Sequence, residues 1–298
     1  MGAFICCFLW GSAFPGIKLG YRALRITEAD TATQILFGGL RFFLAGVMAI
    51  LIGSVLQRRF LFPAQRQWGQ VMKLSFFQTI GQYIFFYIGL AHTSGVRASI
   101  VEGTNVFVAI LVAALVFRQE KLTFRKILGS VLGFAGVVII NLAGNTMGEG
   151  SFLSGDLLIF LSTVCYGTSS VLLKRYSVTT NPVLLSGYQF VWGGGVMAAV
   201  GLLMGGRITT WNEEGVWILL YLAFVSAVAY SLWGTLVKYN SISRVAVFGF
   251  MNPVFGVILS AWLLKEGSSF GFATVLSLLL ICAGIFVVNR ESNKQKGE

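Results

Sequence analysis

Two ionisable side chains, Glu102 and Arg41, lie inside long apolar stretches of the sequence and are its strongest candidates for chemistry. An ionisable group at the centre of a bilayer costs about 2.5–3.5 kcal/mol, so each of them requires a partner or an aqueous cavity. Burial favours the protonated form of a carboxyl group, which would let Glu102 load and release a proton. The alternative is a structural ion pair in which Arg41 or Arg97 neutralises Glu102. Arg41 could also bind a carboxylate of a ligand or fix neighbouring helices.

Amide and aromatic side chains recur at helical spacing within other apolar stretches. Gln78 is followed one helical turn later by Gln82, and Tyr230 is followed by Trp233 at a similar spacing, so each pair shares a helix face. Such groups offer hydrogen bonds to a polar or amphipathic small molecule without the cost of a charge. They also pack and hydrogen-bond between helices, which explains many of them equally well. The candidate substrate-binding residues are Trp10, Gln78, Gln82, Tyr83, Asn105, Tyr166, Tyr230 and Trp233.

The elements that carry these residues are ten apolar stretches separated by short connections. Of the 298 residues, 56% are hydrophobic and 11% are charged, whereas about a quarter of the residues in a soluble domain are charged. A helix that crosses a bilayer needs about 20 apolar residues, and these stretches are continuously apolar, unlike the alternating strands of a barrel. The sequence therefore predicts an all-α integral membrane protein with ten transmembrane helices. The expected spans are at about 3–21, 33–55, 70–91, 97–117, 126–144, 155–173, 182–204, 215–237, 245–264 and 268–289.

The net charge of +11 comes from basic residues in the connections between the expected spans. With the N-terminus inside, the cytoplasmic segments hold fifteen of the 22 lysines and arginines, which favours two cytoplasmic termini. This distribution is unlike the basic face of a nucleic-acid-binding protein. Lys18 and Lys174 lie at matching places near the ends of two spans, where their side chains can reach the membrane interface. We therefore expect a multi-pass protein of the cell (cytoplasmic) membrane that contacts the lipid bilayer and no nucleic acid.

The two halves of the chain resemble each other. The stretch Gly-Val-Met-Ala at 46–49 recurs at 195–198, and the apolar stretch at 106–111 resembles the one at 254–259. The matches follow the same order in both halves, which indicates a duplicated unit. A unit with an odd number of spans inserts its second copy upside down, so we expect two inverted five-helix repeats, the layout of a transporter. The expected divisions are a first repeat at 1–145, a second repeat at 154–290 and a cytoplasmic tail at 291–298.

Three motifs make the sequence resemble the EamA-type transporters of the drug/metabolite transporter superfamily over essentially its whole length. They are Trp10-Gly11-Ser12 in the first span, Leu40-Arg41-Phe42 in the second, and a charged turn at Glu120 or Glu266 before the glycine-rich final span of each half. The resemblance implies ten helices in two inverted repeats around a central substrate cavity. It also implies export of small metabolites, such as amino acids, or of toxic compounds.

Two prolines, Pro15 and Pro253, lie inside apolar stretches. A proline removes a backbone hydrogen bond and bends a helix, so these positions are candidate hinges for gating, with static kinks as the alternative. The sequence departs here from the resemblance. The family commonly has a proline in the fourth helix of each repeat, whereas this chain has only Pro253, with Asn105 near the equivalent place in the first half.

The favoured function is a secondary transporter that exports small metabolites or drug-like compounds by alternating access, with Glu102 as the candidate for proton coupling. The alternatives are a membrane interaction or assembly protein that transports nothing, and an intramembrane enzyme. The sequence contains no HExxH motif, nucleophilic serine motif or phosphate-binding glycine loop, so we expect no catalytic residues, no metal and no cofactor. The sequence leaves open the substrate, the direction of transport, the coupling ion and whether the chain forms a homodimer.

Overall fold

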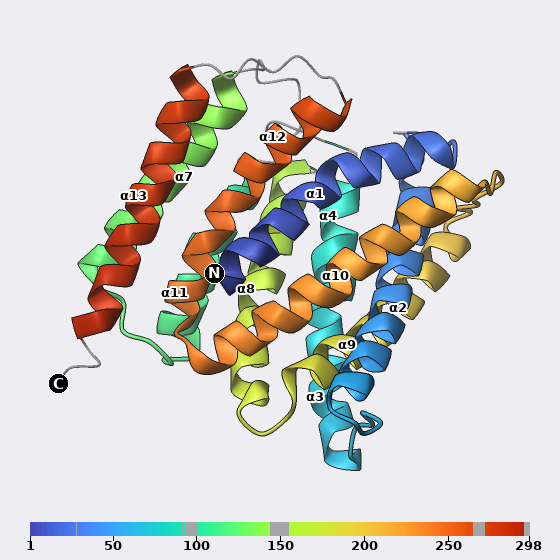
Figure 1. Cartoon of the computed structure of the whole chain (residues 1–298), viewed down its shortest axis with the longest axis horizontal. Coiled ribbons are helices and arrows are strands. Elements are labelled where there is room, and N and C mark those ends of the chain that lie inside the picture. Colours follow the sequence, from blue (N-terminus) through green and yellow to red (C-terminus); the bar gives the residue numbers. More distant parts are fainter. Residues whose placement is uncertain (28, 91, 93–100, 144–154, 265–271, 295–298) are drawn as a thin grey trace.

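A computed structural model describes residues 1–27, 29–90, 92, 101–143, 155–264 and 272–294. Within these ranges all regular secondary structure is helical, and the helices pack side by side as a bundle (Figure 1). The elements η1 and η2 are π-helical and η4 is a 3₁₀ helix. In chain order the elements are α1 (Gly2–Ala23), α2 (Thr31–Leu56), α3 (Gln65–Ser75), η1 (Phe76–Gly81), α4 (Gln82–Leu90), α6 (Asn105–Leu111), η2 (Val112–Val116), α7 (Phe124–Ala143), α8 (Leu157–Ser177), α9 (Pro182–Leu203), α10 (Glu213–Tyr239), α11 (Ile242–Ala246), η4 (Val247–Phe250), α12 (Met251–Leu264) and α13 (Phe272–Lys294).

Several of these helices are long and apolar enough to cross a membrane. Five meet that criterion on their own, namely α1, α2, α8, α9 and α10, and shorter apolar helical stretches lie at Val101–Val116, Ile242–Gly256 and Val275–Asn289. Within the described residues, each of the expected spans falls on one helix or on a run of consecutive helical elements. The all-helical fold is therefore confirmed, whereas the number of crossings and their directions stay predictions. The expected division between the repeats lies in 144–154, outside the described residues, as does 295–298 of the expected tail.

Side-chain caps mark where several helices begin. Asp30 accepts a hydrogen bond from Thr33 N at 2.9 Å and starts α2. Asn212 accepts one from Gly215 N at 2.7 Å and starts α10. Asn181 caps α9, whose first residue is a proline that has no N–H to leave unpaired. Short polar side chains at these positions satisfy backbone donors that a helix start would otherwise expose.

Glycines bring α2 and α9 into backbone contact. A Cβ atom added at Gly39 would lie 2.3 Å from Ala198 N, and one added at Gly53 would lie 2.7 Å from a side-chain methyl of Val183. Small residues allow two membrane helices to approach this closely. Gly39, in the first half of α2, faces Ala198, in the second half of α9. Gly53, near the end of α2, faces Val183, near the start of α9. The two helices therefore run antiparallel.

The helices α7 and α13 form a second close pair, side by side at one edge of the bundle (Figure 1). A Cβ atom at Gly129 would lie 2.5 Å from a methyl group of Val288, near the end of α13. Farther along α7, Gly136 O accepts a hydrogen bond from Ser277 Oγ at 2.7 Å, near the start of α13. These two helices therefore also run antiparallel.

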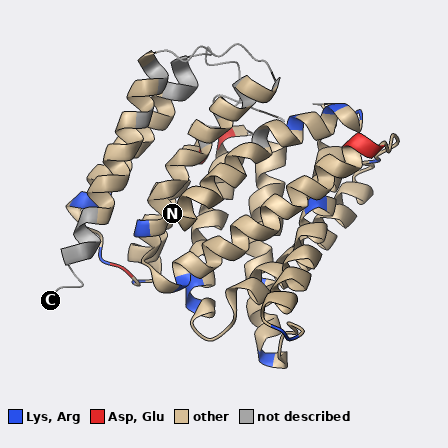
Figure 2. Ribbon diagram, viewed as in Figure 1, with Lys and Arg blue, Asp and Glu red and all other residues tan. Residues whose placement is uncertain are grey.

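Polar contacts join connections from different halves of the chain. In the connection between α8 and α9, Asn181 Nδ2 donates to Gln57 Oε1 at 2.6 Å, just after α2. Thr180 Oγ1 donates to Gln70 Oε1 of α3 at 2.8 Å. In the connection between α9 and α10, Asn212 Nδ2 donates to Ala23 O at the end of α1, at 2.8 Å. Charged residues likewise gather mainly near helix ends and connections (Figure 2).

Large apolar side chains are exposed along the outside of the bundle. Examples are Leu51 on α2, Val131 on α7, and Leu279 and Phe286 on α13. Inside the bundle, phenylalanines such as Phe37 of α2 are fully buried. Apolar residues on both sides of the helices are what a surrounding of lipid requires, since lipid tails are as apolar as the packed core.

Candidate functional site

Four of the eight candidate substrate-binding residues meet at the centre of the bundle. The ring of Trp10 on α1 lies 5.0 Å from that of Tyr230 and 4.9 Å from that of Trp233, both on α10. The hydroxyl groups of Tyr230 and of Tyr83 on α4 are hydrogen-bonded at 2.7 Å. We call Trp10, Tyr83, Tyr230 and Trp233 the central aromatic cluster. It combines residues of three helices from the two halves of the chain.

Two further aromatic residues extend this cluster, and the sequence patterns did not single them out. Phe42 on α2 has its ring 4.4 Å from that of Tyr83 and stacks on Phe190 of α9 at 5.1 Å. Phe190 in turn lies 4.8 Å from Tyr230, edge to face. Tyr166 on α8 lies within electrostatic range of Tyr83. Phe42 was indicated by the sequence, because it belongs to the motif Leu40-Arg41-Phe42 of the second span. Phe190 was not indicated.

Several buried polar atoms, one of them in the central aromatic cluster, have no hydrogen-bond partner among the described residues. Within the described ranges, Trp10 Nε1 and Gln82 Oε1 have no hydrogen-bond partner. Gln78 Oε1, in the π-helix η1, likewise has no hydrogen-bond partner among the described residues. Leaving a buried donor or acceptor unpaired costs about 1–3 kcal/mol, and π-helical turns are frequent at functional sites. These buried atoms therefore have a hydrogen-bonding capacity that no described residue uses.

A buried amide that the sequence patterns missed lies next to η1. Thr79 Oγ1 donates to Gln189 Oε1 on α9 at 2.6 Å, and both side chains are fully buried. In the sequence, Gln189 could have been recognised as a polar residue within an otherwise apolar span. Its Nε2 atom has no partner in the part of the chain that the structure describes. A buried polar contact therefore joins η1 to α9.

Glu102 lies near the central aromatic cluster, and Asn105 is three residues farther along the chain. Glu102 is half-buried in a helical turn at 101–103, and Asn105 begins α6. The carboxyl group of Glu102 is within electrostatic range of the Tyr230 hydroxyl. Of the ion pairs between described residues, none joins Glu102 to Arg41, and Arg97, the other expected partner, lies outside the described residues. The proposed structural pair with Arg41 is therefore not formed in this conformation.

Arg41 is buried in α2 and bonds to a neutral side chain. Its Nε and Nη2 atoms donate to Ser226 Oγ on α10, at 3.1 and 2.9 Å. The guanidinium carbon lies 5.1 Å from the centre of the Phe42 ring. Arg41 thus links α2 to α10 at one side of the central aromatic cluster.

The two candidate hinges, Pro15 and Pro253, differ in the regularity of the helix that contains them. Helix α1 continues from Gly2 to Ala23 through Pro15 without interruption. Pro253 lies in the first turn of α12, directly after the 3₁₀ helix η4. The expected ninth span is therefore not one regular helix but a succession of α11, η4 and α12. A break in helical geometry thus accompanies Pro253, and a hinge role for either proline stays a prediction.

Glu120 forms a charged cluster that the sequence patterns did not predict. Its carboxylate, in the connection between η2 and α7, accepts hydrogen bonds from Ile242 N and Ser243 Oγ at the start of α11. Lys126 Nζ lies 3.1 Å and Lys174 Nζ 3.6 Å from its oxygens. Burial raises the pKa of Glu120, but the Ser243 hydrogen bond and the two lysines outweigh it and hold the pKa below its ordinary value. Lys174 is thus ion-paired with Glu120, and its place at the membrane interface stays a prediction.

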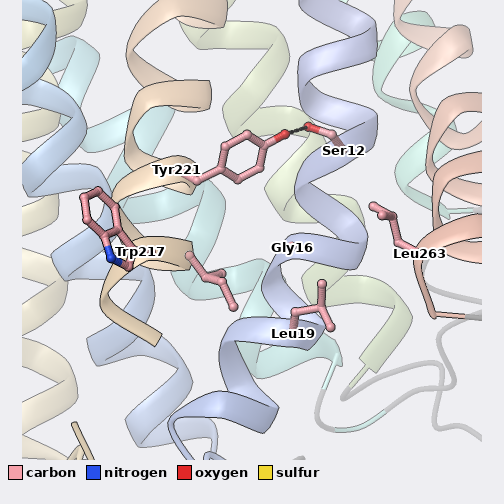
Figure 3. A pocket seen from close by; sticks show the side chains of 7 residues that line it. Ser12, Gly16, Leu19, Trp217, Tyr221 and Leu263 are labelled. Carbon is pink, nitrogen blue, oxygen red and sulfur yellow. Dashed lines mark hydrogen bonds between the residues drawn. The ribbon is translucent and has the colours of Figure 1, made fainter. Parts of the chain in front are cut away.

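An apolar groove of about 280 Å³ lies apart from the central aromatic cluster (Figure 3). Its polar feature is a hydrogen bond of 2.7 Å between the hydroxyl groups of Ser12 and Tyr221. None of its lining residues is one of the eight candidates for substrate binding. The lining residues are Ser12, Gly16, Leu19, Trp217, Ile218, Tyr221 and Leu263.

Comparisons with known proteins match the chain along almost its whole length. The model of the EamA-like transporter family matches residues 1–142 and 153–290, which confirms the resemblance predicted from the sequence. An uncharacterized transporter of Archaeoglobus fulgidus is 26% identical, over 96% of this chain and 95% of its own. The "Probable amino-acid metabolite efflux pump" of Escherichia coli is 26% identical, over 96% of this chain and 92% of its own. One protein of known crystal structure shares the fold, with a TM-score of 0.79 at 16% identity over 99% of this chain and 97% of that one.

Proposed function

Because the chain belongs to the EamA-like transporter family, we propose that this multi-pass membrane transporter exports small metabolites, amino acids among them, by alternating access. The observation that carries the proposal is the central aromatic cluster, which α1, α4 and α10 build together. Aromatic walls with a few unpaired polar atoms suit a small amphipathic molecule. The name of the Escherichia coli relative supports amino-acid metabolites as substrates and export as the direction.

The contacts between corresponding helices support two inverted repeats of five spans each. Helices α2 and α9 hold the same place in the two expected repeats, as do α7 and α13, and each pair runs antiparallel. Two repeats of the same orientation would give parallel pairs. The contact of Asn181 with Gln57 also supports the inversion, because it joins the second connection of the first repeat to the first connection of the second. In such an architecture the two repeats rock about a site between them.

The proposed orientation has both termini in the cytoplasm. It places the basic connections, including Arg58 and Arg59 after α2, on the cytoplasmic side. The exposed apolar side chains of α2, α7 and α13 then face the lipid bilayer. Pro15 and Pro253 are the proposed hinges of the rocking motion.

We expect Trp10→Ala to abolish most export, because the indole ring contacts both Tyr230 and Trp233. Truncating a central aromatic contact costs about 2 kcal/mol or more of binding, which corresponds to a roughly thirtyfold weaker affinity. The measurement uses cells that express the chain and are fed dipeptides, with released amino acids quantified by chromatography.

The matched control is Trp192→Ala, because Trp192 is exposed on the outside of α9. This variant should export at the parental rate with the same amount of protein in the membrane. Equal export by Trp10→Ala and the parent would place the substrate elsewhere. Release no faster than in cells without the protein would instead favour a membrane assembly protein that transports nothing.

We expect Glu102→Gln to flatten the pH dependence of transport. A glutamine cannot bind or release a proton, so a transporter coupled through this carboxyl group would no longer respond to a proton gradient. The measurement is uptake into proteoliposomes with an imposed pH gradient. Glu214→Gln, in the exposed first turn of α10, serves as the control and should keep the parental profile. A Glu102→Gln protein with that same profile would show that coupling lies elsewhere.

A further inference from the structure

Arg41 is a buried cation that has no charged partner in the described ranges. The residue is 4% exposed and lies well inside α2. Its two hydrogen bonds go to one neutral oxygen, Ser226 Oγ. The hydroxyl of Ser226 donates to Leu222 O at 3.0 Å, so it brings a dipole but no charge to the guanidinium. The positive charge of Arg41 is therefore not balanced by this contact.

The other polar groups around the guanidinium are tyrosine hydroxyls from three helices. Tyr21 on α1, Tyr83 and Tyr87 on α4 and Tyr230 on α10 lie within electrostatic range of Arg41. They form two hydrogen-bonded pairs, Tyr83 with Tyr230 and Tyr21 with Tyr87. A tyrosine hydroxyl is neutral at physiological pH. Among the described residues, the neighbours named here are therefore polar but uncharged.

Some N–H groups of the guanidinium make no hydrogen bond to a described residue. The guanidinium presents five N–H groups in a planar fork, and only Nε and Nη2 donate hydrogen bonds to described residues. In the described part of the chain, Nη1 makes no hydrogen bond to an acceptor. A charge buried without an opposite charge is strongly unfavourable and, inside a membrane protein, marks a functional site. The planar fork matches the two oxygens of a carboxylate, with which it can form two parallel hydrogen bonds.

The cation is continuous with the central aromatic cluster. The Phe42 ring, which lies 5.1 Å from the guanidinium carbon, is 4.4 Å from the ring of Tyr83. The second half does not repeat the charge, because Phe190 holds the place on α9 that corresponds to Arg41 when 46–49 is aligned with 195–198. The site therefore has one cationic side and one aromatic side.

We propose that Arg41 binds the carboxylate of the transported molecule through its free N–H groups, while the central aromatic cluster contacts the rest of that molecule. This inference rests on the proposed function and narrows its substrates to molecules that carry a carboxylate. Lipophilic cations are excluded from the site, because Arg41 repels them and offers no acceptor. In the present conformation the guanidinium is covered, so the anion enters when the helices around it separate.

The test measures thermal unfolding of the purified full chain in detergent with sodium benzoate as the probe. Benzamide has the same ring and nearly the same size but no charge, and sodium chloride keeps the ionic strength equal. We expect benzoate to raise the melting temperature in a concentration-dependent way and benzamide to have no effect. Arg41→Gln should lose the benzoate response, whereas Arg207→Gln, at an exposed position between α9 and α10, should keep it. An equal response to both probes, or a benzoate response that survives in Arg41→Gln, would overturn the proposal.

A purely structural arginine gives a different result in the same experiment. Without benzoate, Arg41→Gln should melt at the parental temperature or above it, because the variant no longer buries an unbalanced charge. A lower melting temperature, together with no difference between benzoate and benzamide on the parent, would assign Arg41 to helix fixing. Arg41→Lys keeps the charge without the planar fork and should bind benzoate about tenfold more weakly. This variant tests the site even if Arg41→Gln does not fold.

The test of the anion site and the test of the proposed transport function can give different results, because the melting experiment measures binding without transport. A benzoate response that depends on Arg41, in a protein that moves nothing across proteoliposomes, would overturn the transporter and leave the anion site. Transport of a neutral or cationic metabolite that benzoate does not inhibit would overturn the anion site and leave the transporter.

Discussion

Gly194→Ala is expected to destabilise the protein by about 3 kcal/mol or more, the upper end of the usual cost of overpacking. A Cβ atom at Gly194 on α9 would lie 2.3 Å from Phe43 N and 2.7 Å from Gly39 O, both backbone atoms of α2. A backbone contact cannot be relieved by changing a rotamer, so the two helices would have to move apart along their whole interface. The measurement is the melting temperature of the purified protein, together with its yield from membranes.

The adjacent Gly195 provides the matched control. Its Cβ atom would meet nothing closer than Phe43 Cδ2, at 4.0 Å. Alanine is favoured over glycine inside a helix by about 1 kcal/mol. Gly195→Ala should therefore leave the stability unchanged or raise it slightly. If the two variants melt at the same temperature, α2 and α9 do not pack through the face that contains Gly194.

Glu120→Gln is expected to cost about 3–5 kcal/mol, as does removal of one partner from a buried ion pair. The carboxylate is 6% exposed, and its loss leaves two lysines, Lys126 and Lys174, without their counter-ion. It also weakens the contact with the first turn of α11, where an anion is favourable. Because these groups come from both halves, the variant should loosen the bundle at this side. The measurement is again thermal unfolding of the purified chain.

The same carboxylate predicts how stability depends on pH. Its pKa in the folded protein lies below the ordinary value of 4.5, so the unfolded state binds a proton more readily than the folded state does. The stabilisation is complete above that ordinary value and is lost as the pH falls through the lower pKa of the folded protein. Unfolding followed from pH 7 to pH 3 should show this loss in the parent and in the control Glu213→Gln, an exposed carboxylate. The loss should be absent from Glu120→Gln, and a decline of the same size there would contradict the assignment.

Sequence patterns predicted the helices well because the signal for a helix in a membrane is local. Apolar stretches of sufficient length coincide with α1, α2, α8, α9 and α10. In a bilayer each backbone polar group must be satisfied within its own helix, so length and composition suffice. The π-helices η1 and η2 were not predicted, because they preserve the apolar pattern and differ only in which backbone groups pair.

The central aromatic cluster was predicted in part because it is assembled by corresponding positions of the two halves. Tyr83 and Tyr230 match in the alignment of the halves and are hydrogen-bonded in the structure. A sequence repeat can therefore suggest which residues meet. It does not indicate a residue whose aligned position holds another residue type, and Phe190 and Gln189, which align with Arg41 and Leu40, were missed for that reason.

The sequence alone predicts an all-helical membrane protein of this transporter family and the residue types at its centre, because hydropathy, helical spacing and family motifs are local properties of the chain. Only the tertiary structure places Glu120 against α11 and Lys174, which are far away in sequence. It alone shows Arg41 beside tyrosines and Ser226 rather than paired with Glu102. Which charges are balanced depends on how the helices pack and on which side-chain rotamers that packing allows. Neither can be predicted from the sequence of a single helix.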